Sequence, residues 1–214
     1  MEEKNLVLQR VYHHEKERGD SIFLTQPMGE GKIEDYTWKR VVDESLRMAQ
    51  YLKSLGFPPK SQIAILSKNC AHFIMSDLAI WMAGHVSVAL YPTLTAETVN
   101  YILTHSESKA LFVGKLDTWE EMKSGVPEGM PCISYPLSPP NDFPKWDEII
   151  QNTEPLSERP VRPKDELAIL IYTSGSTGKP KGVMLSFGNI SFAGWNFGEV
   201  FEIGPQDRFL SYLP

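Results

Sequence analysis

The sequence predicts an α/β fold in which helices cover both faces of a mostly parallel sheet. Short apolar runs recur between residues 62 and 135 and again at 167–172. Segments with apolar residues at helical spacing separate these runs, and capping residues or glycines stand at their ends. Strands that alternate with helices of this length form a parallel sheet buried on both faces.

The first element of this pattern is a helix over residues 38–55. Thr37 is available as its N-cap, and Gly56 stops it at the C-terminal end. The other elements follow in the same way. The expected strands span 62–66, 86–91, 110–113, 132–135 and 167–172. Two of the expected helices have a cap in the sequence: residues 70–83 with Asn69, and 96–105 with Thr95. Two shorter helices are expected as well, one with Asp117 and Glu120 as a capping box and one at 146–150.

Proline content divides the chain into three parts. Residues 1–135 are expected to form the α/β subdomain. Seven prolines fall within residues 136–163, and this density marks a connection on the surface. Residues 164–214 then carry a buried strand, a polar loop and a following helix, and 209–214 are expected to belong to one more strand and its turn.

Composition and charge exclude several classes of protein. The formal net charge is -6, which argues against a general affinity for nucleic acid or for acidic membrane surfaces. Cys70 and Cys132 have no partners at metal-ligand spacing and are interpreted as reduced residues of an intracellular protein. The start of the chain lacks the apolar core of a signal peptide, and no apolar stretch is long enough to span a membrane. A cytoplasmic location is expected, with peripheral attachment to a membrane left open.

The chemistry of the sequence concentrates in a loop at residues 173–181, directly after the apolar strand 167–172. Its glycines let backbone N–H groups approach anionic oxygens, its hydroxyls add donors, and its lysines add positive charge. This combination suits a polyphosphate. The residues expected to bind it are Thr173, Ser174, Gly175, Ser176, Thr177, Gly178, Lys179 and Lys181.

The loop is not a Walker A motif. Thr173 stands where that motif needs its first glycine, and Pro180 stands where it needs Ser or Thr. The alternative is a flexible Ser/Gly turn on the surface. The buried strand before the loop and the two lysines in its second half favour a phosphate site instead.

The segment from Tyr172 to Val183 resembles the signature of the adenylate-forming, or AMP-binding, superfamily, which includes acyl-CoA synthetases, peptide-synthetase adenylation domains and firefly-type luciferases. Residues 36–38, 83–88 and 91–94 are similar to early segments of fatty acyl-CoA synthetases. The resemblance implies the N-terminal part of the large domain of such an enzyme. The sequence is therefore expected to be an N-terminal fragment of a ligase for medium- or long-chain fatty acids.

The resemblance also implies the chemistry. An acid attacks the α-phosphate of Mg-ATP to give an acyl adenylate and pyrophosphate, and the thiol of coenzyme A then displaces AMP. ATP, Mg²⁺ and coenzyme A are the expected cofactors, and the partners are small molecules, with a homodimer left open. The loop would hold the β- and γ-phosphates, with Thr177 as the strongest contact. No catalytic residue and no metal ligand are expected within this sequence, so the fragment alone should be inactive.

Two other interpretations of the function remain open. One is a different adenylate-forming ligase, such as an aryl-CoA ligase or a peptide-synthetase adenylation domain. The other is a non-catalytic module that binds a nucleotide or a partner. Phe187 stands where many family members have His, which removes any role for an imidazole there.

Other aromatic and histidine residues are given structural roles. Phe187, Phe192, Trp195, Phe197 and Phe201 lie in a segment that looks helical and are interpreted as core residues, with the border of an acyl tunnel near Trp195 as the alternative. The histidines are interpreted as solvated at positions 13 and 14 and as structural at positions 72, 85 and 105.

Overall fold

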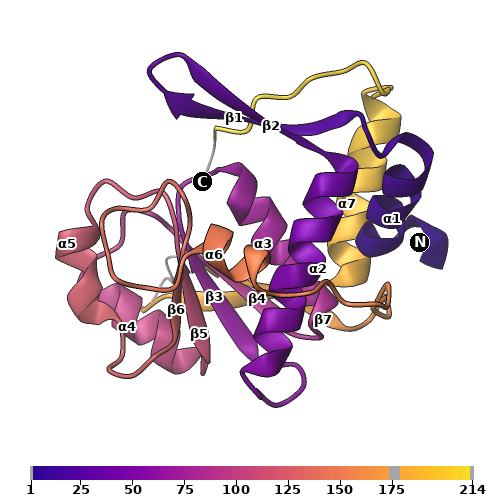
Figure 1. The fold of residues 1–214 in the computed structure, drawn as a ribbon. Helices are drawn as coiled ribbons and strands as arrows, with labels where there is room; N and C mark the ends of the chain where they lie inside the picture. The colour runs from indigo at the N-terminus through magenta and orange to yellow at the C-terminus, as the bar shows by residue number, and fades with distance from the viewer. Residues whose placement is uncertain (1, 174–178, 213–214) are drawn as a thin grey trace.

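Five parallel strands and one antiparallel edge strand form the central sheet (Figure 1). The computed structural model describes residues 2–173 and 179–212. The sheet order is β6-β5-β3-β4-β7-β8. The strands are β3 (Gln62–Leu66), β4 (Val86–Leu90), β5 (Ala110–Val113), β6 (Cys132–Ser134), β7 (Leu167–Thr173) and β8 (Lys181–Ser186). The predicted α/β fold with a mostly parallel sheet is confirmed, and β8 adds an antiparallel edge that the sequence did not predict.

Helices cover both faces of this sheet because the strand side chains are apolar on both sides. Along β3, Ile63 and Ile65 belong to one buried cluster, whereas Ala64 and Leu66 belong to another. The first cluster includes residues of α2, α3 and α6, and the second includes residues of α4 and α5. The bounds of the helices are α2 (Trp38–Ser54), α3 (Ala71–Met82), α4 (Ala96–His105), α5 (Trp119–Met122), η2 (Lys123–Gly125), α6 (Trp146–Gln151) and α7 (Phe187–Val200).

The N-terminal elements were not predicted from the sequence. The 3₁₀ turn η1 (Glu3–Asn5) and helix α1 (Val7–Arg18) precede an antiparallel hairpin, β1 (Ile22–Gly29) and β2 (Lys32–Thr37), which forms a sheet of its own. Figure 1 shows this hairpin above the central sheet, beside the C-terminal segment. Its tight turn has Glu30 at φ 51° and Gly31 at φ 76°, a conformation that glycine adopts without strain.

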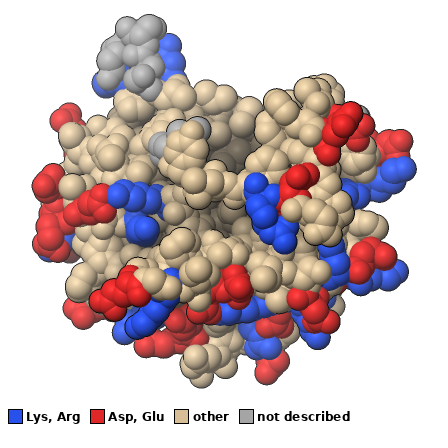
Figure 2. Space-filling view, turned by 90° about the horizontal axis from the view of Figure 1, so that it is seen from above, with Lys and Arg blue, Asp and Glu red and all other residues tan. Residues whose placement is uncertain are grey.

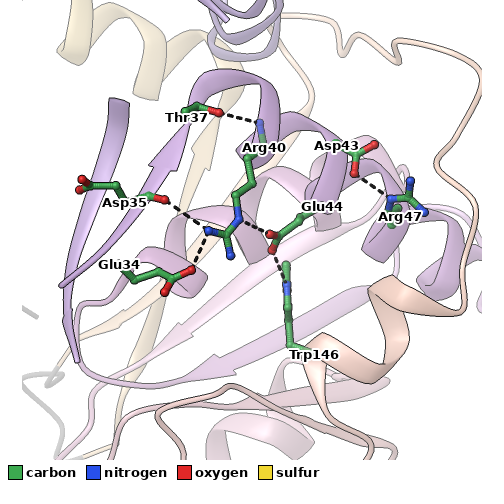
Figure 3. Close-up of polar contacts among 8 residues, drawn as sticks. All are labelled: Glu34, Asp35, Thr37, Arg40, Asp43, Glu44, Arg47 and Trp146. Carbon is green, nitrogen blue, oxygen red and sulfur yellow. Dashed lines mark hydrogen bonds and ion pairs between the residues drawn. The ribbon is translucent and has the colours of Figure 1, made fainter. Parts of the chain in front are cut away.

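An ion-pair network fixes the hairpin to the body of the protein (Figure 3). Arg40 of α2 pairs with Glu34 of β2 and with Glu44 of its own helix, both at 2.7 Å. The second oxygen of the buried Glu44 accepts a 3.0 Å hydrogen bond from the indole of Trp146 in α6. The network therefore joins β2, α2 and α6, and it satisfies a carboxylate that would be costly to bury alone.

Most predicted helix ends are confirmed. Thr37 accepts a hydrogen bond from the backbone N of Arg40 at 3.2 Å, and Thr95 accepts one from Thr98 at 3.3 Å. Gly56 and Gly84 follow α2 and α3 with positive φ, as a C-terminal glycine should.

Three local predictions were wrong. Helix α3 begins at Ala71 after Cys70, so Asn69 is not its cap. Helix α5 begins after Thr118, and the predicted capping-box carboxylates pair with lysines instead, Asp117 with Lys68 and Glu120 with Lys123. Residues 209–212, the described part of the predicted last strand, do not form a strand.

The connection at residues 136–163 is anchored by buried side chains. Trp146, Ile149 and Leu156 belong to the core on the α2 side of the sheet, and Arg162 is buried as well. The strand that follows, β7, lies beside β4 in the same sheet as the strands of residues 1–135. The boundaries at 135 and 163 stay predictions.

Candidate functional site

The predicted phosphate loop closes a β-hairpin. Thr173 ends β7 and is paired across the ladder with Lys181, the first residue of β8. Thr173, Lys179 and Lys181 are exposed, so all three can reach a ligand from solvent. The other predicted contacts lie outside the described residues and stay predictions: Ser174, Gly175, Ser176, Thr177 and Gly178.

This hairpin leaves the sheet at the edge where α/β proteins bind ligands. Strands β6, β5, β3, β4 and β7 are parallel, so their carboxyl ends all lie at one edge. The chain runs from β3 to β4 on one side and returns to β5 on the other. Ligands of open α/β sheets bind where such a reversal opens a crevice.

Two lysines that the sequence analysis missed meet at this reversal. The backbone N of Lys68, after β3, donates to the carbonyl of Lys115, after β5, at 2.8 Å. The hydroxyl of Ser67 accepts a 3.0 Å bond from the backbone N of Lys115. Gly114 permits this approach, because a Cβ there would lie 2.2 Å from the Ser67 hydroxyl oxygen. The sequence signal that could have found them is a lysine two residues after each of the predicted strands 62–66 and 110–113.

A cavity of about 930 Å³ opens beside these lysines. Its other walls are formed by strand β1 of the N-terminal hairpin, the start of α3 and residues 203–212. Figure 2 shows this face from above, hollowed near its middle, with Lys and Arg side chains to either side. The cationic residues that line the cavity are Arg18, Lys68, Lys115 and Arg208. Its size is that of a site for a small molecule or cofactor.

One wall of the cavity is held by a buried glutamine. The Oε1 atom of Gln26 in β1 accepts a 2.9 Å hydrogen bond from the backbone N of Ala71, the first residue of α3. Cys70 also lines the cavity, and burial raises the pKa of its thiol. The Cys70 thiol therefore stays protonated at neutral pH and is a poor nucleophile. Both cysteines are free and buried.

Four of the five aromatic residues predicted as core in the segment 187–201 are exposed. Phe187 is buried under Arg162, whose guanidinium lies 5.1 Å from the ring centroid, and against Trp81. In contrast, Phe192, Trp195, Phe197 and Phe201 are exposed. The core interpretation was wrong for these four, because a sequence pattern does not reveal which helix face another element covers.

One of the two histidines predicted to be solvated is partly buried. His13 is exposed as predicted, but His14 is half-buried against Trp38, and burial lowers its pKa to about 4. His72 packs against Tyr36 and Trp146, and burial likewise lowers its pKa to about 4. Among residues 2–173 and 179–212, no three His, Cys, Asp or Glu side chains come together as a metal site.

None of the helices in the described parts of the chain is both long and apolar enough to cross a membrane.

Comparison with known proteins gives a consistent result. The family described as AMP-binding enzyme matches residues 11–214. Fatty acyl-CoA synthetase A of Dictyostelium discoideum is 32% identical over 230 residues, which cover 99% of this chain and 34% of that protein. The chain therefore spans about a third of the length of this relative.

Solved structures agree on the fold. Acetoacetyl-CoA synthetase from Streptomyces lividans superposes with a TM-score of 0.81 at 23% identity, over 95% of this chain and 34% of that one. A benzoate CoA ligase from Burkholderia xenovorans LB400 gives a TM-score of 0.71 at 20% identity, over 88% and 36%.

Proposed function

Because the chain belongs to the AMP-binding enzyme family, we propose that it serves an ATP-dependent ligase that joins a carboxylic acid to the thiol of coenzyme A. The observation that carries the proposal is the strand–loop–strand hairpin at the carboxyl edge of the sheet, with Thr173 paired to Lys181 at its base. Hydroxyls, glycine N–H groups and lysines in one loop are the donors that a polyphosphate requires.

The proposed reaction has two displacements. A carboxylate oxygen of the acid attacks the α-phosphorus of ATP, and pyrophosphate leaves. The sulfur of coenzyme A then attacks the acyl carbon, its proton is released, and AMP leaves. Residues 173–181 hold the β- and γ-phosphates and so stabilise the charge that develops on the leaving group. Their role is to bind and orient the nucleotide.

Mg²⁺ accompanies ATP in the proposed reaction and neutralises part of the phosphate charge. Among residues 2–173 and 179–212, no three His, Cys, Asp or Glu side chains come together around a common point.

A fatty acid is the proposed substrate class. Its support is the Dictyostelium relative, a fatty acyl-CoA synthetase that is 32% identical over almost the whole chain. Aryl-CoA ligases share the fold at lower identity, and they are the competing substrate class. Small-molecule partners and action in the cytoplasm, with or without attachment to a membrane surface, complete the proposal.

The decisive experiment compares ATP with AMP. If the loop holds the β- and γ-phosphates, Thr177→Ala should weaken ATP binding about ten- to a hundredfold, the effect of losing one hydrogen bond to a charged oxygen. Binding of AMP, which lacks those phosphates, should change less than twofold. Titration calorimetry with both nucleotides measures this, and Thr177→Ser is the matched control because it keeps the hydroxyl at the same position. Equal losses for ATP and AMP would contradict the assignment of the loop.

The class of acid that the protein binds can be tested in the same way. Binding of a fatty acid and of benzoate in the presence of a non-hydrolysable ATP analogue separates the two substrate classes. Tighter binding of benzoate would favour the aryl-CoA ligase reading.

A further inference from the structure

The tyrosine that enters the phosphate loop is held by a residue from a distant helix. Tyr172 is the last residue of β7 before Thr173, and its ring is buried in the cluster under α4. Its hydroxyl lies 2.7 Å from the Nδ1 atom of His105, the last residue of α4. The two residues are separated by 67 positions in the sequence, so this contact ties the loop to a helix that packs across the sheet.

The same ring lies against the strand that leaves the loop. Gly182 is paired with Tyr172 across the ladder, directly after Lys181. A Cβ at Gly182 would lie 3.3 Å from the Cζ atom of the Tyr172 ring, which is closer than an ordinary contact. The glycine therefore provides room for the ring, and the ring lies against the backbone of the glycine.

His105 is itself held in place. Its ring stacks on Tyr101, one turn earlier in α4, with centroids 5.3 Å apart and planes 28° apart. His105 is exposed on its other side. The Tyr172 hydroxyl can donate to a neutral Nδ1 atom or accept from a protonated one, so the contact does not depend on one state of the imidazole.

We propose that His105 is a positioning residue for the phosphate loop, acting through the hydroxyl of Tyr172. The Tyr172 side chain contacts α4 at its hydroxyl and Gly182 at its ring, and these contacts adjoin both ends of the loop. Fixing Tyr172 fixes Thr173 and Lys181 relative to each other and to the sheet. A loop whose ends are fixed loses less conformational freedom when it binds phosphates.

This inference rests on the proposed function for its effect on ATP, so the experiment has two readouts. His105→Ala and Tyr172→Phe should each weaken ATP binding by about two- to tenfold, the loss expected for one net hydrogen bond. The double variant should be no weaker than either single variant, because both remove the same contact. His105→Asn, which keeps a polar group near the position of Nδ1, should recover part of the loss. Thr104→Ala, at the neighbouring exposed position of α4, is the matched control and should bind like the unmodified protein.

The second readout needs no nucleotide. Amide hydrogen exchange of His105→Ala should accelerate at residues 173–182 and stay unchanged in β3 and β5. Additive losses in the double variant, or unchanged exchange at 173–182, would overturn the positioning role. If the unmodified protein does not bind ATP, the proposed function fails, and the exchange measurement still decides whether His105 holds the loop.

Discussion

Arg162 donates a 3.1 Å hydrogen bond from Nη1 to the carbonyl oxygen of Trp81, and this bond joins the proline-rich connection to the C-terminal end of α3. The same nitrogen donates to the carbonyl of His85 at 3.0 Å. Nε pairs with Glu166 at 2.6 Å, just before β7. One buried side chain therefore binds a carbonyl at the end of α3 and another just before β4, and it orients the strand that leads to the proposed phosphate loop.

Replacement of this arginine should destabilise the fold. Arg162→Met keeps much of the apolar bulk but removes the donor shared by the carbonyls of Trp81 and His85. It also leaves Glu166 with Lys60 as its remaining cationic partner. We expect the free energy of unfolding to fall by about 2–4 kcal/mol in urea titrations. Arg159→Met is the control: Arg159 is an exposed partner of Glu15, and loss of such a pair costs at most about 1 kcal/mol. Equal effects of the two substitutions would refute the anchoring role of Arg162.

The carboxyl of Asp77 should make stability depend on pH. Burial raises its pKa to about 7, and the nearby Ser87 hydroxyl offsets part of that rise. In the unfolded chain an Asp titrates near 3.9. Between these values the folded protein holds a proton that the unfolded chain has released. The contribution of Asp77 to the free energy of unfolding is therefore full below about pH 4 and is lost as pH rises through 7, with a slope of about 1.4 kcal/mol per pH unit.

Asp77→Asn removes this dependence because the amide stays neutral. The variant should gain stability relative to the unmodified protein as pH rises from 4 to 8. His72 titrates in the opposite direction, because burial lowers its pKa to about 4, so the two proteins must be compared at each pH. The exposed Asp142→Asn serves as the control. A difference that does not change with pH would show that Asp77 is charged in the folded protein.

Some of this architecture could be predicted from the sequence because it is local. Thr37 caps α2 three residues before the N–H that it binds, and Gly56 and Gly84 end their helices by their own backbone conformation. The start of α3 could not be predicted in the same way, since its first N–H is bound by Gln26, 45 residues earlier. The cap could not be predicted because its two residues lie far apart in the sequence, although the hydrogen bond itself is an ordinary one.

The candidate site likewise has a local part that the sequence predicts and a tertiary part that it does not. The loop at 173–181 is contiguous, so its composition is visible in the sequence. Lys68 and Lys115 meet only because β3 and β5 are neighbours, and strand order is a tertiary property. The exposed aromatic residues between 192 and 201 were wrongly predicted as core for the same reason.

The uncharged segment 182–198, which makes up most of β8 and α7, should make this chain self-associate. No charged residue occurs from Gly182 to Gly198. In this segment Met184 is 67% exposed, Phe192 59% and Phe197 50%, and β8 is an edge strand. An apolar edge without charges favours pairing with another chain. Light scattering should therefore detect dimers or larger species, and Met184→Lys should shift them toward monomer.

A control separates this effect from a general loss of solubility. Ile33→Lys changes an apolar side chain that is 64% exposed on the separate hairpin, and it should leave the association unchanged. A chain that stays monomeric at all concentrations, or an equal effect of both lysines, would exclude β8 and α7 as the associating surface.

The bond between Gln26 and Ala71 should hold the hairpin against the cavity. Gln26→Met preserves length and volume but removes the acceptor, which leaves a buried N–H without a partner at a cost of about 1–3 kcal/mol. Gln26→Glu keeps an acceptor and places a negative charge at the N-terminus of α3, where the helix dipole favours it, so it should retain more stability. Thr25→Ser, at the exposed neighbouring position, keeps the hydroxyl that donates to Asp35 and is the control. Urea titration gives the energies, and amide exchange locates them. Faster exchange in residues 22–37 for Gln26→Met alone would confirm that this bond fixes the cavity wall, whereas uniform acceleration across β3 and β5 would show that it supports the whole core instead.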